Sequence, residues 1–369
     1  MVNTEVFEPR WASAPGNTIL RTLAQQGHTV EDFADWANLP DPAIRRLITG
    51  EAEITSTIAA VLAERLGGSV SFWLRRDDRY RENREWSSLD AIAEKLPVRD
   101  MVDRGWIEKP STWRERAKAC LDFFGVTTSA EWEERYQAPL QTANFRRSEK
   151  LLTDDAAVAA WLRQAELLAQ SRQTQNFSAA VLRSELDNVR NWCRHPDPVR
   201  FIPEIADALS RAGVSLVVLR TPSKCPVSGA SKKLSNGSAL IALSARYLAD
   251  DHFWFTLFHE IAHLLLHGAS AVPFVDEFEA GDIPTSSIEQ EADNFASTTL
   301  VPNGVKVLQK GSSGPSQKEI VSFAHAVGVS PGIVVGQLQH DGIISFNNRN
   351  ALKRRYRWDV ITGELVRKR

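Results

Sequence analysis

The feature that most constrains this fold is FWFTLFHEIAHLLLHG, residues 253–268, a long apolar stretch interrupted by histidines and a glutamate. A helix that is apolar on every side must be covered by other elements. Each unpartnered polar group in such surroundings costs free energy, so His259, Glu260 and His263 need partners there. Either the two histidines are hydrogen-bonded core residues, or all three residues form a site.

His259, Glu260 and His263 make the pattern HExxH. Residues four apart share one face of a helix, so both imidazoles can bind a single Zn²⁺. Glu260 follows the first histidine directly, where it can act as general base towards a water activated by the metal. The pattern predicts a zinc hydrolase, whereas a structural zinc site would not require Glu260.

A catalytic zinc needs a third protein ligand, and the next predicted helix, SIEQEADNFASTTLVP, offers Glu289, Glu291 and Asp293. Glu289 and Asp293 are four apart and share a face, so we favour Glu289 as ligand. Asp293 would then accept an N–H from a ligand histidine. On a helical projection, Glu291 lies at a similar angle to the apolar stripe of this helix, so it remains the alternative third ligand.

His267 and the acidic stretch beyond it are further candidates. His267 follows His263 by four residues, so it either contacts the substrate or caps the end of the helix. Between the helices, Asp276, Glu277, Glu279 and Asp282 predict a solvated loop that makes the mouth of the site anionic.

Length and composition predict a multidomain globular protein. The chain has 369 residues, 24% of them charged, with 44 Lys+Arg against 46 Asp+Glu. Its three cysteines are widely spaced, which argues against a disulfide framework. No run of 18 apolar residues and no apolar leader is present, so we expect a cytoplasmic protein without a membrane partner.

We expect a mostly helical α+β protein with three regions. Residues 1–86 contain four short amphipathic helices, at 15–27, 29–39, 41–50 and 54–68, and end in a charge-dense segment. Residues 87–200 show helical signals but no readable chemistry. Residues 201–369 contain strands at 214–219 and 239–243, a third strand and turn between them, and the HExxH helix. A basic tail closes the chain, with eight basic residues against two acidic ones from Phe346 onwards.

DDHFWFTLFHEIAHLLLHG followed by EQEADNFASTTLVP resembles the ImmA/IrrE family of metallo-endopeptidases, and the resemblance covers about residues 212–358. It implies a zincin-like domain in a protease that cleaves transcriptional repressors or antitoxin-like proteins in stress, phage or mobile-element responses. The motif match carries over His259 and His263 as ligands, Glu260 as general base and Glu289 as third ligand. The family's LLMP is LVP here, a volume-conserving change.

The N-terminal region resembles the helix-turn-helix of the XRE class, especially HigA-like antitoxins. Ala34 holds the small position, and Asn38, where the family usually has Gly, tolerates a left-handed turn. In the expected recognition helix DPAIRRLITG, Arg45 and Arg46 are the cations available to DNA. Ten Arg against thirteen Asp+Glu in residues 1–86 predict weak attraction to phosphate, so this domain binds DNA weakly or instead mediates dimerisation or repressor docking.

These features favour a gated cytoplasmic zinc endopeptidase whose other domains control access to the site, with an edge strand holding the substrate extended. The alternative is a DNA-binding regulator or antitoxin with a structural or sensory zinc site. DNA contact through the helix-turn-helix or the basic tail, and a homodimer, are compatible with both hypotheses.

Overall fold

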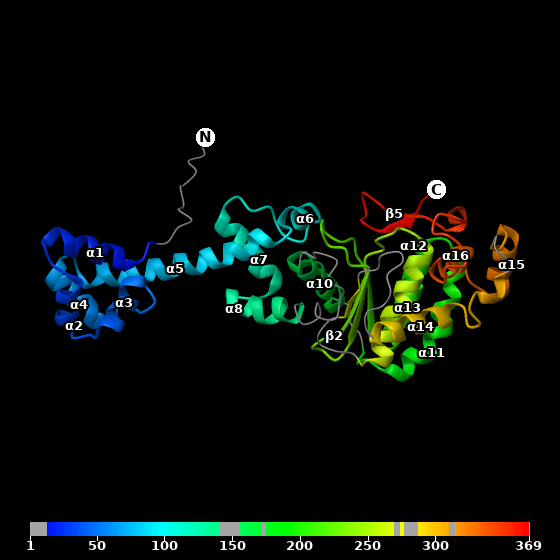
Figure 1. The fold of residues 1–369 in the computed structure, drawn as a ribbon, viewed down its shortest axis with the longest axis horizontal. Helices are drawn as coiled ribbons and strands as arrows, with labels where there is room; N and C mark the ends of the chain where they lie inside the picture. The colour runs from blue at the N-terminus through cyan, green and yellow to red at the C-terminus, as the bar shows by residue number, and fades with distance from the viewer. Residues whose placement is uncertain are drawn as a thin grey trace. The chain divides into compact units, whose positions relative to one another are not determined.

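The computed structural model describes residues 13–140, 155–171, 175–268, 274–276, 287–309 and 314–368. It is mostly helical with a small sheet in the C-terminal region, which confirms the predicted α+β class (Figure 1). The chain divides into two compact units, one of Met1–Val98 with Glu108–Glu131 and one of Arg99–Ile107 with Trp132–Arg369. The three cysteines are buried and free, as their spacing predicted.

The first unit begins with four short helices at the predicted places. They are α1 (Pro15–Gln26), α2 (Val30–Ala37), α3 (Asp41–Thr49) and α4 (Ser56–Leu66). Thr29 and Asp32 form a capping box that starts α2. Asn38 ends α2 in the left-handed conformation (φ 49°), as the sequence predicted.

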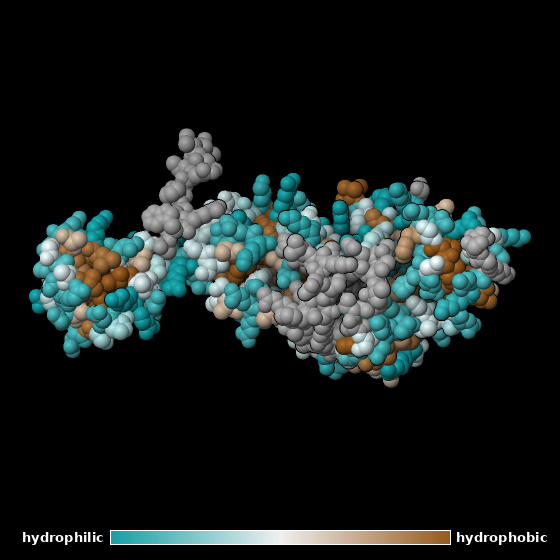
Figure 2. All heavy atoms as spheres, viewed as in Figure 1, coloured by the Kyte–Doolittle hydropathy of each residue, from teal (hydrophilic) through white to brown (hydrophobic). Residues whose placement is uncertain are grey.

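The four helices pack around a small apolar core. Its buried members include Ile19, Leu23, Phe33, Ile44, Leu47, Leu62 and Trp73. Gly16 lets α1 approach α3, because a β-carbon there would lie 1.9 Å from the carbonyl oxygen of Ile48. Apolar side chains also gather on the surface of these helices, at the left of Figure 2.

The charge-dense segment 75–86 belongs to one long helix, α5 (Val70–Lys95). The domain boundary expected near Trp86 therefore falls inside a continuous helix. Interleaved charges of both signs are typical of a solvated helix and of a linker alike, so the sequence did not distinguish these two structures. The first unit also contains α7 (Trp113–Phe124), which packs on α5, and most of α8 (Ser129–Trp132).

The second unit contains the sheet and the HExxH helix. Its helices before the sheet are α6 (Val98–Asp103, except its first residue), a π-helical turn (Glu133–Gln137), α10 (Asp155–Gln170), α11 (Ala179–Asn191), a 3-10 turn (Trp192–Arg194) and α12 (Pro198–Arg211). Those after it are α13 (Asp250–Leu266), α14 (Ser287–Leu300), a 3-10 turn (Lys306–Leu308), α15 (Gln317–Val327), α16 (Pro331–His340) and a 3-10 turn (Asn350–Leu352).

The sheet has the strand order β1-β3-β2-β4. Its strands are β1 (Val214–Val218), β2 (Gly229–Lys233), β3 (Ala239–Leu243) and β4 (Phe274–Asp276). β1 runs parallel to β3, and β2 runs antiparallel to both β3 and β4. The first three strands confirm the prediction. β4 was not predicted, because it begins the acidic stretch that we expected to be a loop. The other acidic residues of that stretch, Glu277, Glu279 and Asp282, lie outside the described residues.

Both faces of the sheet are covered, so β1 and β3 are buried almost throughout and are mostly apolar, with Ser215 the polar residue in β1. Val214, Leu216 and Ile241 pack with α12 and α13 in the main core, while α10 covers the opposite face (Figure 1). On that second face Trp161 donates to the carbonyl oxygen of Leu219 at 2.9 Å, and Lys232 pairs with Glu166 at 2.6 Å.

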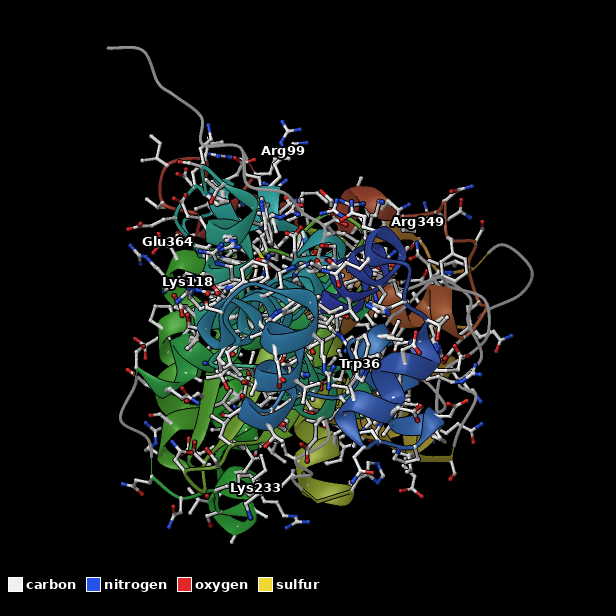
Figure 3. All side chains as sticks on the ribbon, turned by 90° about the vertical axis from the view of Figure 1, so that its left-hand side faces the viewer. Trp36, Arg99, Lys118, Lys233, Arg349 and Glu364 are labelled. Carbon is white, nitrogen blue, oxygen red and sulfur yellow. The ribbon has the colours of Figure 1, made fainter. Side chains whose placement is uncertain are left out.

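The predicted basic tail is a folded element. β5 (Tyr356–Trp358) and β6 (Leu365–Arg367) form a hairpin, and the chain just before it bridges Ala249 at the start of α13. Arg349 and Glu364, labelled in Figure 3, are exposed. Val360 and Ile361 in the hairpin turn are 95% and 94% exposed.

Among the described helices, no single one is long and apolar enough to cross a membrane. The bent pair α15 and α16 reaches that length and apolarity only when the two are taken together.

Candidate metal centre

The site is built on α13, whose sequence fixes which residues face each other. Fourteen of its residues are buried, and His259, Glu260 and His263 are each 0% exposed. The four-residue spacing puts the two imidazoles one turn apart, with ring centroids separated by 4.7 Å. The pattern therefore places two nitrogen donors side by side inside the core, as predicted.

Helix α14 packs along α13 and brings Glu289 to the two histidines. The Nε2 atoms of His259 and His263 are 2.9 Å apart, and Oε2 of Glu289 lies 3.1 Å from the first and 3.5 Å from the second. Zinc–ligand bonds of 2.0–2.1 Å in tetrahedral geometry separate ligand atoms by about 3.3 Å. The triangle of donor atoms thus has the size that a tetrahedral zinc ion requires.

Asp293, one turn after Glu289, orients the first histidine. Its Oδ1 lies 2.8 Å from Nδ1 of His259. When Nδ1 donates to this carboxylate, the lone pair of Nε2 points towards His263 and Glu289. Lone pairs and a carboxylate converging at this distance repel each other unless a cation or proton lies between them, so the donor set fits a metal ion.

Glu260 lies against the first residue of β2, Gly229. A β-carbon on Gly229 would lie 2.3 Å from Oε1 of Glu260 and 2.6 Å from Cγ2 of Thr256. Only a glycine allows the strand to pass this close to the carboxylate. Sequence reasoning did not single out Gly229 or Thr256, because nothing local shows that this strand lies against this helix.

His267 and Glu291 lie at the edge of the site. His267 is the C-cap residue that follows the last residue of α13, and its ring centroid is 5.4 Å from that of His263. Burial lowers the pKa of His267, and the neighbouring His263 lowers it further. Nδ1 of His267 lies 3.9 Å from Oε2 of Glu291, whose side chain is 62% exposed. The structure therefore places Glu289, and not Glu291, beside both HExxH histidines.

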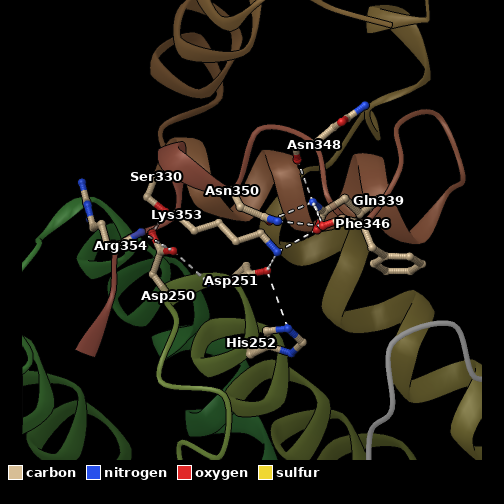
Figure 4. A network of polar contacts seen from close by, with 10 residues as sticks. All are labelled: Asp250, Asp251, His252, Ser330, Gln339, Phe346, Asn348, Asn350, Lys353 and Arg354. Carbon is tan, nitrogen blue, oxygen red and sulfur yellow. Dashed lines mark hydrogen bonds and ion pairs between the residues drawn. The ribbon is translucent and has the colours of Figure 1, made fainter. Parts of the chain in front are cut away.

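A buried polar network holds the start of α13 (Figure 4). Asp250 accepts hydrogen bonds from Oγ of Ser330 at 2.7 Å and from the backbone N–H of Arg354 at 3.0 Å. Asp251 forms an ion pair with Lys353 at 2.5 Å, in which both side chains are 7% exposed. Lys353 consequently does not belong to the exposed basic surface that the sequence predicted for the tail.

Two glycines of α16 make room for this network. A β-carbon on Gly332 would lie 2.2 Å from Oδ1 of Asp250, and one on Gly336 would lie 2.9 Å from Oδ2 of Asp251. Burial raises the pKa of Asp250 to about 6, although the hydrogen bond from Ser330 opposes this. The four-residue spacing of the two glycines in the sequence is the signal for this close approach.

In the first unit, Arg45 and Arg46 are exposed on α3. Arg46 lies 3.9 Å from Glu51, and both side chains are more than half exposed. Asp41 and Pro42 are exposed at the start of the same helix. The structure thus leaves the two arginines accessible, with the acidic side chain of Glu51 close to Arg46.

Comparison with known proteins agrees with this geometry. No curated protein and no solved structure matches the chain. Residues 215–338 match the family model Peptidase_M78, described as the IrrE N-terminal-like domain. That segment includes β1 except its first residue, β2, β3, and the helices α13 and α14 that carry the candidate site. This part of the second unit is therefore similar to a metallopeptidase domain of the IrrE/ImmA type.

Proposed function

We propose that this chain is a zinc-dependent endopeptidase that cleaves a transcriptional repressor or an antitoxin-like protein in a stress, phage or mobile-element response. The observation that carries the proposal is the triangle of His259, His263 and Glu289 donor atoms beside a buried Glu260. The similarity to Peptidase_M78 supports the reaction class. The substrate class is an expectation from the family resemblance.

When bound, zinc supplies Lewis acidity, which acidifies water and polarises a peptide carbonyl. His259, His263 and Glu289 would hold it, with Asp293 fixing the orientation of the His259 ring. Glu260 accepts a proton from the attacking water and passes it to the leaving amine. Its burial against Gly229 limits the positions that this carboxylate can take.

The edge strand expected to hold the substrate is β4. β2 lies nearer to α13, but its outer edge pairs with β4, with Gly229 opposite Asp276. An extended substrate therefore adds outside β4 or replaces it, because β2 offers no free edge beside Gly229. Either route brings the peptide past the strand that borders Glu260.

Co-expression with candidate helix-turn-helix repressors tests the proposal. Wild type should fragment a cognate repressor, and Glu260→Gln should reduce cleavage by on the order of 10² to 10⁴ while keeping zinc and fold. Glu291→Gln is a matched control, because its side chain is largely exposed. Undiminished cleavage by Glu260→Gln would refute the mechanism.

The second candidate is a DNA-binding regulator, favoured by the helix arrangement of the first unit and the exposure of Arg45 and Arg46 on α3. We expect weak, salt-dependent binding at most. A gel-shift titration with Arg45→Ala and Arg46→Ala tests the surface. Tight binding to an operator that both variants retain would place the contact elsewhere, for example on the C-terminal hairpin. If the zinc-loaded wild type cleaves no repressor but binds an operator tightly, the regulator hypothesis replaces the protease.

A further inference from the structure

A small cavity lies beside the start of β2 and the first turns of α13. It is lined by Ser228, which precedes β2, by the end of β3 with the segment that follows it, and by residues of α13 that include His252 and Thr256. Its volume is about 10 Å³, which is the space that one water molecule requires. The size of the cavity therefore limits an occupant to a single water.

The lining of the cavity contains a hydroxyl group that needs a partner. Ser228 is 4% exposed, and among the described residues its Oγ has no hydrogen-bond partner. Buried hydroxyl groups are nearly always bonded to protein, to ordered water or to a ligand. Two other buried serines, Ser215 and Ser231, also lack a partner for Oγ in the described parts of the chain, but neither lines this cavity. Of the three, Ser228 is the one whose hydroxyl borders a space for water.

Helix α13 supplies further polar groups to the lining. Thr256 contributes a second buried hydroxyl group, and His252 contributes a ring. Burial lowers the pKa of His252, so the ring is neutral near pH 7 and can donate a hydrogen bond at one nitrogen and accept one at the other. A buried water typically makes about three hydrogen bonds. The polar side chains around the cavity are sufficient for that number.

The two segments that meet at the cavity also meet beside Glu260. Gly229 follows Ser228 directly, and a β-carbon on it would lie 2.3 Å from Oε1 of Glu260. The same β-carbon would lie 2.6 Å from Cγ2 of Thr256. The carbonyl oxygen of Ser228 accepts hydrogen bonds from the backbone N–H of Ser244 at 2.9 Å and from its Oγ at 3.2 Å. These bonds hold the chain before Gly229 to the end of β3, whereas no direct hydrogen bond in the described structure joins Ser228 to α13.

From the volume of this cavity and the unpaired hydroxyl of Ser228, we infer a binding site for one water that joins the start of β2 to α13. The water bonds to Oγ of Ser228 on one side and to His252 and Thr256 on the other. It thereby holds Gly229 in place against Glu260, the proposed general base. Ser228 is then a positioning residue, and this consequence for catalysis rests on the proposed peptidase function.

The bridge matters because glycine has the greatest conformational freedom of all residues. Ser244 restrains the backbone before Gly229 from the side of β3, and the water restrains it from the side of α13. Without the water, the start of β2 can move away from the helix, and Glu260 gains positions that do not suit proton transfer. A displacement of about 1 Å in a catalytic group costs on the order of a hundredfold in rate. We expect the loss of one bridging water to cost less, about tenfold.

A high-resolution crystal structure of the full-length, zinc-loaded protein tests the water site. We expect one water about 3 Å from Oγ of Ser228. In Ser228→Ala, the water should be lost and Gly229 should lie farther from Glu260. Ser215→Ala is the matched control, because Ser215 is also buried and without a partner for Oγ in the described structure, yet lies outside the cavity lining. A wild-type cavity without water, or a water that stays in place in Ser228→Ala, would overturn the site.

Kinetics with the same variants test the positioning role. The substrate is the repressor that wild type fragments in the co-expression assay. Ser228→Ala should lower kcat by about tenfold and leave KM and zinc content unchanged, because the bridge acts on the position of the base and not on substrate binding. Ser215→Ala should keep the kcat of wild type. Thermal unfolding of each variant separates this effect from a loss of stability, which a purely structural serine would show without a change in kcat.

The two measurements separate the inference from the proposed function. If Ser228→Ala loses the water but keeps both kcat and the position of Gly229, the positioning role is wrong. If zinc-loaded wild type cleaves no repressor but its crystal structure contains the water, the proposed function fails and the water site stands. If cleavage occurs and the cavity binds no water, the water site alone fails.

Discussion

Gly229 passes so close to Glu260 that a β-carbon on the glycine would lie 2.3 Å from Oε1 of the carboxylate. The two residues belong to a strand and a helix that are far apart in the sequence. Their proximity makes the start of β2 one wall of the compartment that holds Glu260, the proposed general base. The absence of a side chain at this one position lets the strand border the carboxylate.

The first prediction follows from this contact. Gly229→Ala should push Glu260 and Thr256 aside, because the new methyl group would also lie 2.6 Å from Cγ2 of Thr256. We expect cleavage to fall on the order of a hundredfold, as for a catalytic group displaced by about 1 Å. Overpacking should destabilise the fold by about 1–3 kcal/mol.

Steady-state cleavage and zinc analysis on the same sample check this prediction. Zinc content should stay the same, because the candidate ligands on α13 face α14. Ser231→Ala, two residues along the same strand, is the control for a general effect of altering β2. Full activity of Gly229→Ala would show that Glu260 has room to move.

The second prediction concerns the third ligand. Glu289→Gln should weaken zinc binding strongly, whereas Glu291→Gln should have little effect, because Glu291 is largely exposed and contacts only the edge of the site. Wild type should bind about one zinc per chain through two imidazoles and one carboxylate. Competition with a zinc chelator measures both variants. If Glu291→Gln were the weaker binder, the ligand assignment would be wrong.

The third prediction concerns Asp293. Asp293→Asn keeps the size of the side chain but removes the charge that holds the N–H of the His259 ring at 2.8 Å. Loss of such a partner typically lowers metal affinity by about 10- to 100-fold. The same chelator titration measures it, with Asn294→Ala, an exposed neighbour on α14, as control. Unchanged affinity would mean that Asp293 does not orient the ligand.

The local parts of this structure could be predicted from the sequence. The first four helices follow from apolar periodicity and from end signals such as the Thr29–Asp32 capping box and Gly50. The four-residue spacings of His259 with His263 and of Glu289 with Asp293 likewise predict which side chains share a face. These inferences need only the period of a helix.

The remaining features depend on contacts between distant segments. β4 lies in an acidic stretch in which apolar and polar residues do not alternate, so periodicity does not predict a strand there. Its pairing with Gly229 joins two segments that are distant in the sequence. The sequence predicted Lys353 to be a surface cation, because a count of charges shows neither its burial nor its ion pair with Asp251. The family resemblance indicated the candidate metal site but contained nothing about either contact.

The fourth prediction concerns the pH dependence of stability through Asp250. Its pKa rises from 3.8 to about 6 on folding, because burial disfavours the charged carboxylate. Between these values the native state binds more protons than the unfolded state, so this group destabilises the protein as pH rises from about 4 to 6. The contribution amounts to about 3 kcal/mol at most.

Asp250→Asn cannot ionise and should lose this part of the pH dependence. Its free energy of unfolding, measured in urea at pH values from 4 to 7, should therefore fall less with pH than that of wild type. Asp359→Asn is a suitable control, because backbone N–H groups lower the pKa of Asp359, so its effect on the pH dependence has the opposite sign. If Asp250→Asn and wild type have the same slope, Asp250 is ionised throughout, and the hydrogen bonds from Ser330 and Arg354 outweigh its burial.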